Sequence, residues 1–263
     1  METQAIGSNM LSKVPQVTLA FWVVKVLATT LGETGGDAVT MSWLGETTPE
    51  ANGTGYLIGT AIFGVIFIAA VLVQIGARKF HPFLYWLTIV ATTTVGTTLA
   101  DYCTRSLGIG YTGGSTILLI LVIASLLIWR WSTGSISVET VSTPKVEVFY
   151  WATIMFSQTL GTALGDWVAD TNEMGYRGAA GVFGGLLLLT ALLYYFTSLS
   201  RAVLFWAAFI LTRPLGAVVG DFLDKPLAKG GLDLSRYTAS FALLVVIIAL
   251  ILIFRQKPAS KAH

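Results

Sequence analysis

The chain has 263 residues, of which 54% are hydrophobic and only 11% are charged. Soluble domains carry about 25% charged residues, so this composition excludes an ordinary soluble protein. The single Cys excludes an internal disulfide and any multi-Cys metal or iron–sulfur site, and the two His exclude His-rich metal ligation. The net charge of +2 is small, and we expect no nucleic-acid partner and no bound cofactor.

Long apolar runs recur along the chain, at residues 56–75, 117–129, 181–195 and 241–254. Taken in chain order, the hydrophobic segments predict eight helices, at 14–37, 56–75, 83–101, 115–131, 146–166, 179–199, 201–221 and 237–254. Helices of about 17–24 residues match a hydrocarbon core of roughly 30 Å. We therefore predict an all-α membrane protein in which eight transmembrane helices form a single domain.

An aromatic residue followed by Trp lies in the first half of every second predicted helix. A Gly follows the Trp by ten residues, a small residue lies four further on, and an Asp comes next. The four Trp are Trp22, Trp86, Trp151 and Trp206, and the four Asp are Asp37, Asp101, Asp166 and Asp221. Identical spacing in four copies indicates an internal repeat. The repeats cover about 14–77, 78–131, 146–200 and 201–255, and each combines a motif helix with a plainer apolar helix.

The spacing of the motif places its Gly, its small residue and its Asp on one broad helix face. Small residues four apart let the backbones of neighbouring helices approach closely in lipid. The pairs are Gly32/Gly36, Gly96/Ala100, Gly161/Gly165 and Gly216/Gly220. We expect the four motif helices to line the centre of the bundle and the plainer helices to face lipid.

The distribution of basic residues predicts the orientation. Two helices per repeat make all four repeats run in the same direction. Basic residues such as Arg78, Lys79, Arg201 and Arg255 gather between the repeats and after the last helix. By the positive-inside rule, both termini are expected in the cytoplasm, and the motif Asp toward the outer end of their helices.

Acidic residues on the polar face of the motif helices are the candidate site. Glu33 lies one turn deeper than the four motif Asp and occurs in the first repeat alone. Ionisable groups within membrane spans are costly and usually face a water-filled path or a partner, although an Asp near a helix end is often simply solvated. Carboxylate and hydroxyl oxygens suit Mg²⁺, Ca²⁺ or Mn²⁺. We predict no catalytic residue, and we predict ion binding by Glu33, Asp37, Asp101, Asp166 and Asp221.

Two basic residues, Lys25 and Arg213, lie deep within predicted spans. We interpret them as charge-balancing residues: Arg213 would pair with Glu33 or an Asp, and Lys25 would extend to the cytoplasmic surface. A role in gating is the alternative. Pro214 predicts a kink in the seventh helix. The motif Trp residues are interpreted as packing or interface anchors.

These residues favour an integral membrane transporter of a hard divalent cation, with Mn²⁺ preferred as a trace metal. Carboxylates held close together also titrate, so the site would exchange protons for the cation. The expected partners are the lipid bilayer, a small inorganic cation and protons. One alternative is a non-transporting membrane sensor or assembly protein. An intramembrane aspartyl hydrolase is weaker, because the Gly-Asp pairs lack the first Gly of that motif, and we expect no enzymatic activity.

The repeat, with Lys13-Val14-Pro15-Gln16-Val17-Thr18 before its first copy, resembles a bacterial family of membrane-anchored proteins built from tandem repeats of unknown function. The resemblance covers about residues 13–255. It implies a bacterial inner-membrane protein with four repeats, and it implies no substrate. The fourth copy departs most from the pattern, with Arg213-Pro214 where the first copy has Thr29-Thr30.

Overall fold

The computed structural model describes residues 12–171 and 174–260. Its long helices are α1 (Leu19–Asp37), α2 (Thr54–Gly76), α3 (Pro82–Asp101), α4 (Gly110–Thr133), α5 (Pro144–Thr171), α6 (Gly175–Phe196), α7 (Arg201–Asp224) and α8 (Arg236–Ile253). The short elements are the π-helices η1 (Ala38–Trp43) and η2 (Tyr102–Ser106) and the 3₁₀-helices η3 (Val138–Thr140) and η4 (Leu227–Lys229). The prediction of an all-helical chain is confirmed.

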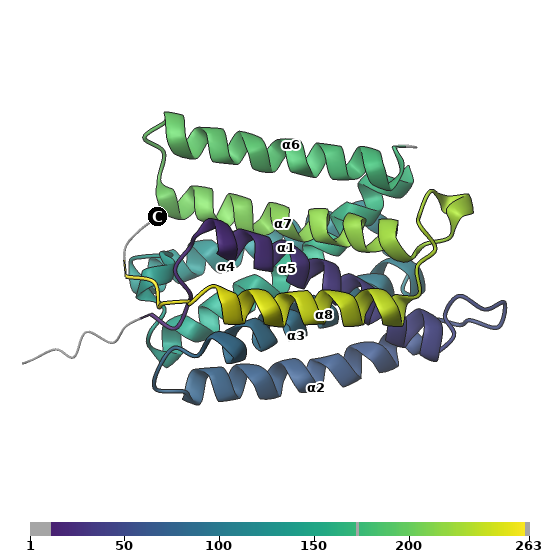
Figure 1. Ribbon diagram of the computed structural model, residues 1–263, viewed down its shortest axis with the longest axis horizontal. Coiled ribbons are helices and arrows are strands. Elements are labelled where there is room, and N and C mark those ends of the chain that lie inside the picture. The colour runs from purple at the N-terminus through teal and green to yellow at the C-terminus, as the bar shows by residue number, and fades with distance from the viewer. Residues whose placement is uncertain (1–11, 172–173, 261–263) are drawn as a thin grey trace, which may run out of the picture.

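The four motif helices, α1, α3, α5 and α7, form a closed ring. α1 packs on α3, α3 on α5, α5 on α7, and α7 on α1. The four outer helices cover this ring, with α2 on α3, α4 on α5, α6 on α7 and α8 on α1. Each outer helix therefore covers the motif helix of the next repeat, and the last repeat closes on the first (Figure 1).

Glycine sets the distance between neighbouring motif helices. The first Gly of each repeat lies against the residue seven positions after the Trp of the next repeat. A Cβ on the Gly would meet the Cβ of that residue at 2.8 Å for Gly32/Thr93, 3.0 Å for Gly96/Gln158, 2.5 Å for Gly161/Arg213 and 2.6 Å for Gly216/Thr29. The same contact recurs at all four interfaces, so the motif helices run in one direction with a common register. These four glycines lie at the closest approach of the helices.

At Gly36 and Gly165 the second small residue of the pair packs less tightly than the first. It faces the residue eleven positions after the Trp of the next repeat. The distance between a Cβ added to the glycine and the Cβ of that residue would be 3.2 Å for Gly36/Thr97, 3.2 Å for Gly165/Ala217 and 2.7 Å for Gly220/Glu33. Ala100 holds the equivalent place in the second repeat, where it is buried, so a methyl group fits there. The helices therefore move slightly apart toward the Asp, and only Gly220 is as confined as the first glycines.

Aromatic side chains from all four repeats pack in a circle that closes one end of the bundle, and we call this group the aromatic cluster. The aromatic residue before each Trp packs on the Trp of the next repeat. The ring centroids are 5.4 Å apart for Phe21/Trp86, 5.8 Å for Tyr85/Trp151, 6.0 Å for Tyr150/Trp206 and 5.7 Å for Phe205/Trp22. The hydroxyls of Tyr85 and Tyr150 are 2.7 Å apart inside this cluster. The packing interpretation of the Trp residues agrees with this arrangement.

The two ends of the described chain meet at the aromatic end of the bundle. Pro15 and Pro258 form an antiparallel bridge, and the Trp86 indole donates to the Gln256 side chain at 2.8 Å. Lys13 forms a 2.6 Å ion pair with Glu147 at the start of α5. The bridge joins the two ends of the described chain to each other, and the other two contacts tie these ends to the second and third repeats.

Six helices in the described part of the chain have the length and composition of membrane spans: α2, α3 with η2, α4, α6, α7 and α8. The outer helices expose large apolar side chains over much of their length, as expected for a lipid-facing surface. α1 and α5 are not among the six. They carry many of the polar side chains that point into the ring, and these side chains lower their mean hydropathy.

Several helix boundaries differ from the predictions. α1 begins at Leu19, where the Thr18 hydroxyl caps the Phe21 amide at 3.3 Å. α4 and α6 begin earlier than predicted, at Gly110 and Gly175, whose φ angles of 71° and 61° suit glycine.

Two of the four motif Asp end their α-helices as predicted, because α1 ends at Asp37 and α3 at Asp101. α5 and α7 continue as α-helix past the motif Asp, whereas π-helices follow Asp37 and Asp101. In α5 and α7 the side chains of Asp166 and Asp221 bond basic partners while the backbone continues as α-helix, so these two helices end later than predicted, at Thr171 and Asp224. The predicted kink at Pro214 corresponds to no interruption of α7, which is one helix from Arg201 to Asp224.

Candidate functional site

The four motif Asp form a layer at the end of the ring opposite the aromatic cluster, and we call it the aspartate layer. Asp37, Asp101, Asp166 and Asp221 are each no more than 3% exposed. Carboxylate oxygens of Glu33, Asp166 and Asp221 all lie within 4.8 Å of one another. The same holds for Asp37, Asp221 and Asp224, so Asp221 belongs to both groups. Four of the five predicted acids therefore converge, whereas Asp101 lies in neither group and is linked to Asp166 through Arg105.

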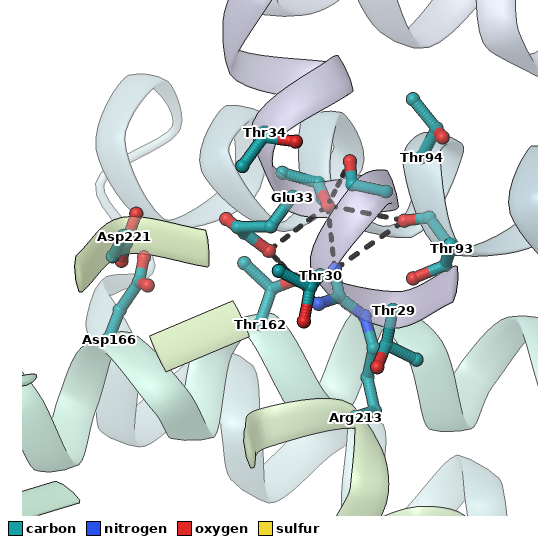
Figure 2. Close-up of polar contacts among 12 residues, drawn as sticks. Thr29, Thr30, Glu33, Thr34, Thr93, Thr94, Thr162, Asp166, Arg213 and Asp221 are labelled. Carbon is teal, nitrogen blue, oxygen red and sulfur yellow. Dashed lines mark hydrogen bonds and ion pairs between the residues drawn. The ribbon is translucent and has the colours of Figure 1, made fainter. Parts of the chain in front are cut away.

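Glu33 forms a buried ion pair with Arg213 near the axis of the ring. The Arg213 Nη1 donates to Glu33 Oε2 at 3.0 Å, and neither side chain is more than 3% exposed. Figure 2 shows Glu33 between the Arg213 guanidinium and the carboxylates of Asp166 and Asp221. The predicted pairing of Arg213 with Glu33 is thus present, and it joins the first repeat to the fourth.

Threonine hydroxyls complete the surroundings of this ion pair. Arg213 Nη2 donates to Thr97 Oγ1 at 2.6 Å and to the Thr162 hydroxyl, and it reaches the Thr93 carbonyl at 3.4 Å. Thr97 and Thr162 also donate to Glu33 Oε2, at 3.2 and 3.4 Å. One residue from each of the four motif helices takes part, so the network fixes the centre of the ring.

Two basic residues that sequence reasoning did not assign to the site bridge the aspartate layer. Arg105 in η2 contacts Asp101 at 2.8 Å and Asp166 at 3.0 Å. Lys225, one residue beyond α7, contacts Asp221 at 3.0 Å and also Asp37. Each base thus joins the Asp of its own repeat to the Asp of the next repeat.

These two bases occupy equivalent positions, nineteen residues after the motif Trp, in the second and fourth repeats. The first and third repeats have Met41 and Asp170 at this position. The fourfold ring therefore carries a twofold pattern of charge. The spacing of four residues between Asp and base, which suits pairing on a helix, is the sequence signal that would have found them.

The surroundings of Lys225 favour its protonated form. Burial by itself lowers the pKa of Lys225, but the carboxylates of Asp221, Asp37 and Asp224 together raise the pKa well above its usual value. Asp224 is also 3.4 Å from the Arg236 guanidinium, which extends the network of charges toward α8.

Lys25 behaves differently from the prediction that it extends to the cytoplasmic surface. Its side chain is fully buried, and its Nζ lies 4.1 Å from the centre of the Phe209 ring. Among the described residues, Nζ has no hydrogen-bond partner and no carboxylate within ion-pair distance. The face of an aromatic ring attracts cations, so this contact favours a positive charge on Nζ. Charge balance by Lys25 stays a prediction.

Two hollows open beside the aspartate layer. The larger, of about 490 Å³, lies between η1, η4 and the start of α8, and the smaller, of about 330 Å³, lies between the end of α5 and the start of α6. Arg105, Lys225 and Lys229 line both hollows, and Asp221 and Asp224 each line one. The two hollows therefore border the aspartate layer, and basic side chains line both of them.

The repeat pattern matches a known family. The family model described as Repeat of Unknown Function (DUF347) matches residues 20–80, 84–135, 149–200 and 204–257. The chain belongs to this family. The prediction of four tandem repeats of unknown function is confirmed, and each match begins within two residues of an aromatic-Trp pair. No curated protein and no solved structure matches the chain significantly.

Proposed function

We propose that the protein is a membrane transporter for a hard divalent cation, and that Mn²⁺ is the first ion to test. The observation that supports this proposal is the convergence of buried acids from three repeats, Glu33, Asp166 and Asp221, to within 4.8 Å. Carboxylates inside a membrane protein are costly and are kept where they serve an ion pathway or a proton relay.

The charge of the site supports an exchange of one divalent ion for protons. Six carboxylates and four bases are joined by ion pairs at this end of the bundle, which leaves two negative charges when all are ionised. One divalent cation or two protons neutralise that excess. Oxygen ligands are those that Mg²⁺, Ca²⁺ and Mn²⁺ prefer, and nothing in the ligand set selects one of the three.

The membrane arrangement that we propose has all eight long helices crossing the bilayer. α1 and α5 cross because the other helices enclose their polar faces, although each alone is too polar to pass as a span. Both termini lie in the cytoplasm, and the membrane is the bacterial inner membrane. The aspartate layer then faces outward, and the aromatic cluster closes the cytoplasmic end. Lipid, a small cation and protons are the partners.

The decisive experiment is Mn²⁺ uptake into liposomes that contain the purified protein. We expect uptake by the wild type and loss of uptake in the double variant Asp37→Asn/Asp166→Asn, which removes a carboxylate from each of the two acidic groups. Glu50→Gln is the matched control, because Glu50 is an exposed acid in the loop before α2. Uptake that survives the double substitution would refute a carboxylate pathway.

A second candidate is a non-transporting membrane scaffold or sensor. The observation in its favour is that each motif Asp already has a basic partner, Arg105 or Lys225, that joins neighbouring repeats. On this view the charges only hold the ring together. The liposome assay distinguishes the two candidates. A scaffold would show no Mn²⁺ uptake by the wild type, and its Asp37→Asn/Asp166→Asn variant would show only a loss of thermal stability.

A further inference from the structure

Lys225 occupies the position that a metal ion would take in the second acidic group. Its Nζ contacts Asp37, lies 3.0 Å from Asp221 Oδ1 and 3.9 Å from Asp224 Oδ1, and approaches the Met41 sulfur at 3.5 Å. Oxygens of the same three Asp lie within 4.8 Å of one another. The ammonium and a divalent ion cannot share this space, because two cations a few ångströms apart repel strongly in a buried site.

The carboxylates retain capacity for a second cation. Asp37 Oδ1 and Asp166 Oδ1 are buried and have no hydrogen-bond or ion-pair partner among the described residues. A buried carboxylate oxygen without a partner is unfavourable and is a ready ligand for a cation. Within the acidic group around Lys225, Asp37 therefore keeps one carboxylate oxygen that the lysine does not bond.

Lys225 and its counterpart Arg105 both border the two hollows, but they hold their acids in different ways. The lysine side chain is a flexible stem that ends in a single charge, and it lines both the 490 Å³ and the 330 Å³ hollow. Arg105 uses separate nitrogens of its planar guanidinium to bond Asp101 and Asp166. The guanidinium thus binds two acids through two nitrogens in a fixed plane, whereas the Lys225 ammonium binds Asp37 and Asp221 through a single atom on a flexible stem.

We propose that Lys225 is a tethered counter-cation that a divalent ion displaces from Asp37, Asp221 and Asp224. Binding moves the ammonium into the adjoining hollow, and release of the ion returns it. Lys225 thereby lowers the affinity of the site and keeps the acids neutralised between ions. This inference rests on the proposed function for the class of ligand, and it adds a positioning residue and a mode of competition.

The first test is Mn²⁺ binding to the purified full chain, measured as free Mn²⁺ by electron paramagnetic resonance. We expect Lys225→Gln to bind Mn²⁺ about tenfold more tightly than the wild type, because the internal competitor is gone. Lys225→Arg keeps the charge and should show no such gain. Lys229→Gln removes a positive charge that lines both hollows but contacts no acid within ion-pair distance among the described residues, and its gain should be much smaller. Damage to the fold would weaken binding, so a gain in affinity cannot come from a structural defect.

The second test uses the wild type alone and does not depend on a variant that folds. Acetylation of Lys225 by acetic anhydride, followed by mass spectrometry, should increase when Mn²⁺ is added, because the displaced amine enters the hollow. Unchanged or reduced acetylation overturns the proposal. Equal Mn²⁺ affinity of wild type and Lys225→Gln overturns this inference and leaves the transporter proposal intact. Absence of Mn²⁺ binding by both proteins overturns both proposals.

Discussion

The close approach of α7 to α1 at Gly216 gives the sharpest prediction of stability. A Cβ at this position would lie 2.6 Å from the Thr29 Cβ and 3.0 Å from the Thr29 carbonyl carbon. Ordinary contacts begin at 3.4 Å, so the substitution Gly216→Ala brings two atoms about 0.8 Å too close. Both Thr29 atoms are fixed by the backbone, and a change of rotamer does not relieve the clash.

The expected loss of stability is about 2 kcal/mol. Overpacking of a close-packed interior costs about 1–3 kcal/mol. Separation of the helices also weakens the bond from Thr29 Oγ1 to the Thr212 carbonyl, 3.2 Å long, which contributes about 1 kcal/mol. The better helix propensity of Ala returns about 1 kcal/mol. For a chain of this size the net effect lowers Tm by about 4–8 °C.

Thermal unfolding of the purified protein in detergent is monitored by the fluorescence of a dye that reacts with the Cys103 thiol as it becomes exposed. Gly184→Ala is the matched control, because a Cβ at this position on α6 would meet no heavy atom within 4 Å. We expect the control to unfold at or slightly above the wild-type temperature. If Gly216→Ala unfolds at the same temperature as Gly184→Ala, the tight packing of the ring is wrong.

Three further predictions test the centre, the surface and the closure of the ring. Arg213→Gln leaves Glu33 buried without its ion partner and should lower the free energy of unfolding, measured with denaturant, by about 3–5 kcal/mol. The double variant Glu33→Gln/Arg213→Gln should recover a large part of that loss. A double variant as unstable as Arg213→Gln would contradict the pairing. Val65 is 70% exposed on the side of α2 that we expect to face lipid, and Val65→Arg places a charge there. This substitution should reduce the amount of membrane-integrated protein relative to Val65→Leu, because insertion of Arg costs about 2.5–3.5 kcal/mol. Equal amounts of the two variants would mean that this face is not in lipid. Topology reporters fused to the two termini should both report the cytoplasm, and opposite signals would be incompatible with the bridge between Pro15 and Pro258.

The central helices and their acids followed from the sequence because the evidence for them is local. The motif repeats four times with one spacing, and helical geometry puts its small residues and its Asp on one face. Burial of that face is required in lipid, so convergence of Glu33, Asp166 and Asp221 was predictable. The outer helices were equally predictable from their uniform apolarity.

The basic partners of the acids were not predicted, because each bridges two repeats. Arg105 reaches Asp166, and Lys225 reaches Asp37 across the closure of the ring. Sequence analysis assigned neither base to the site. Sequence analysis also predicted that Lys25 extends to the cytoplasmic surface, whereas its Nζ lies inside the bundle over the ring of Phe209, which belongs to another repeat.

The sequence by itself determined the number of repeats, the helical class and the face of each motif helix that carries polar groups. Those properties depend on spacing along one helix. Only the tertiary structure decided that each outer helix covers the motif helix of the following repeat, and that α8 closes on α1. Apolar faces in lipid have no preferred partner by composition, so steric fit at the glycines and the ion pairs that cross two of the four interfaces favour the order of the ring.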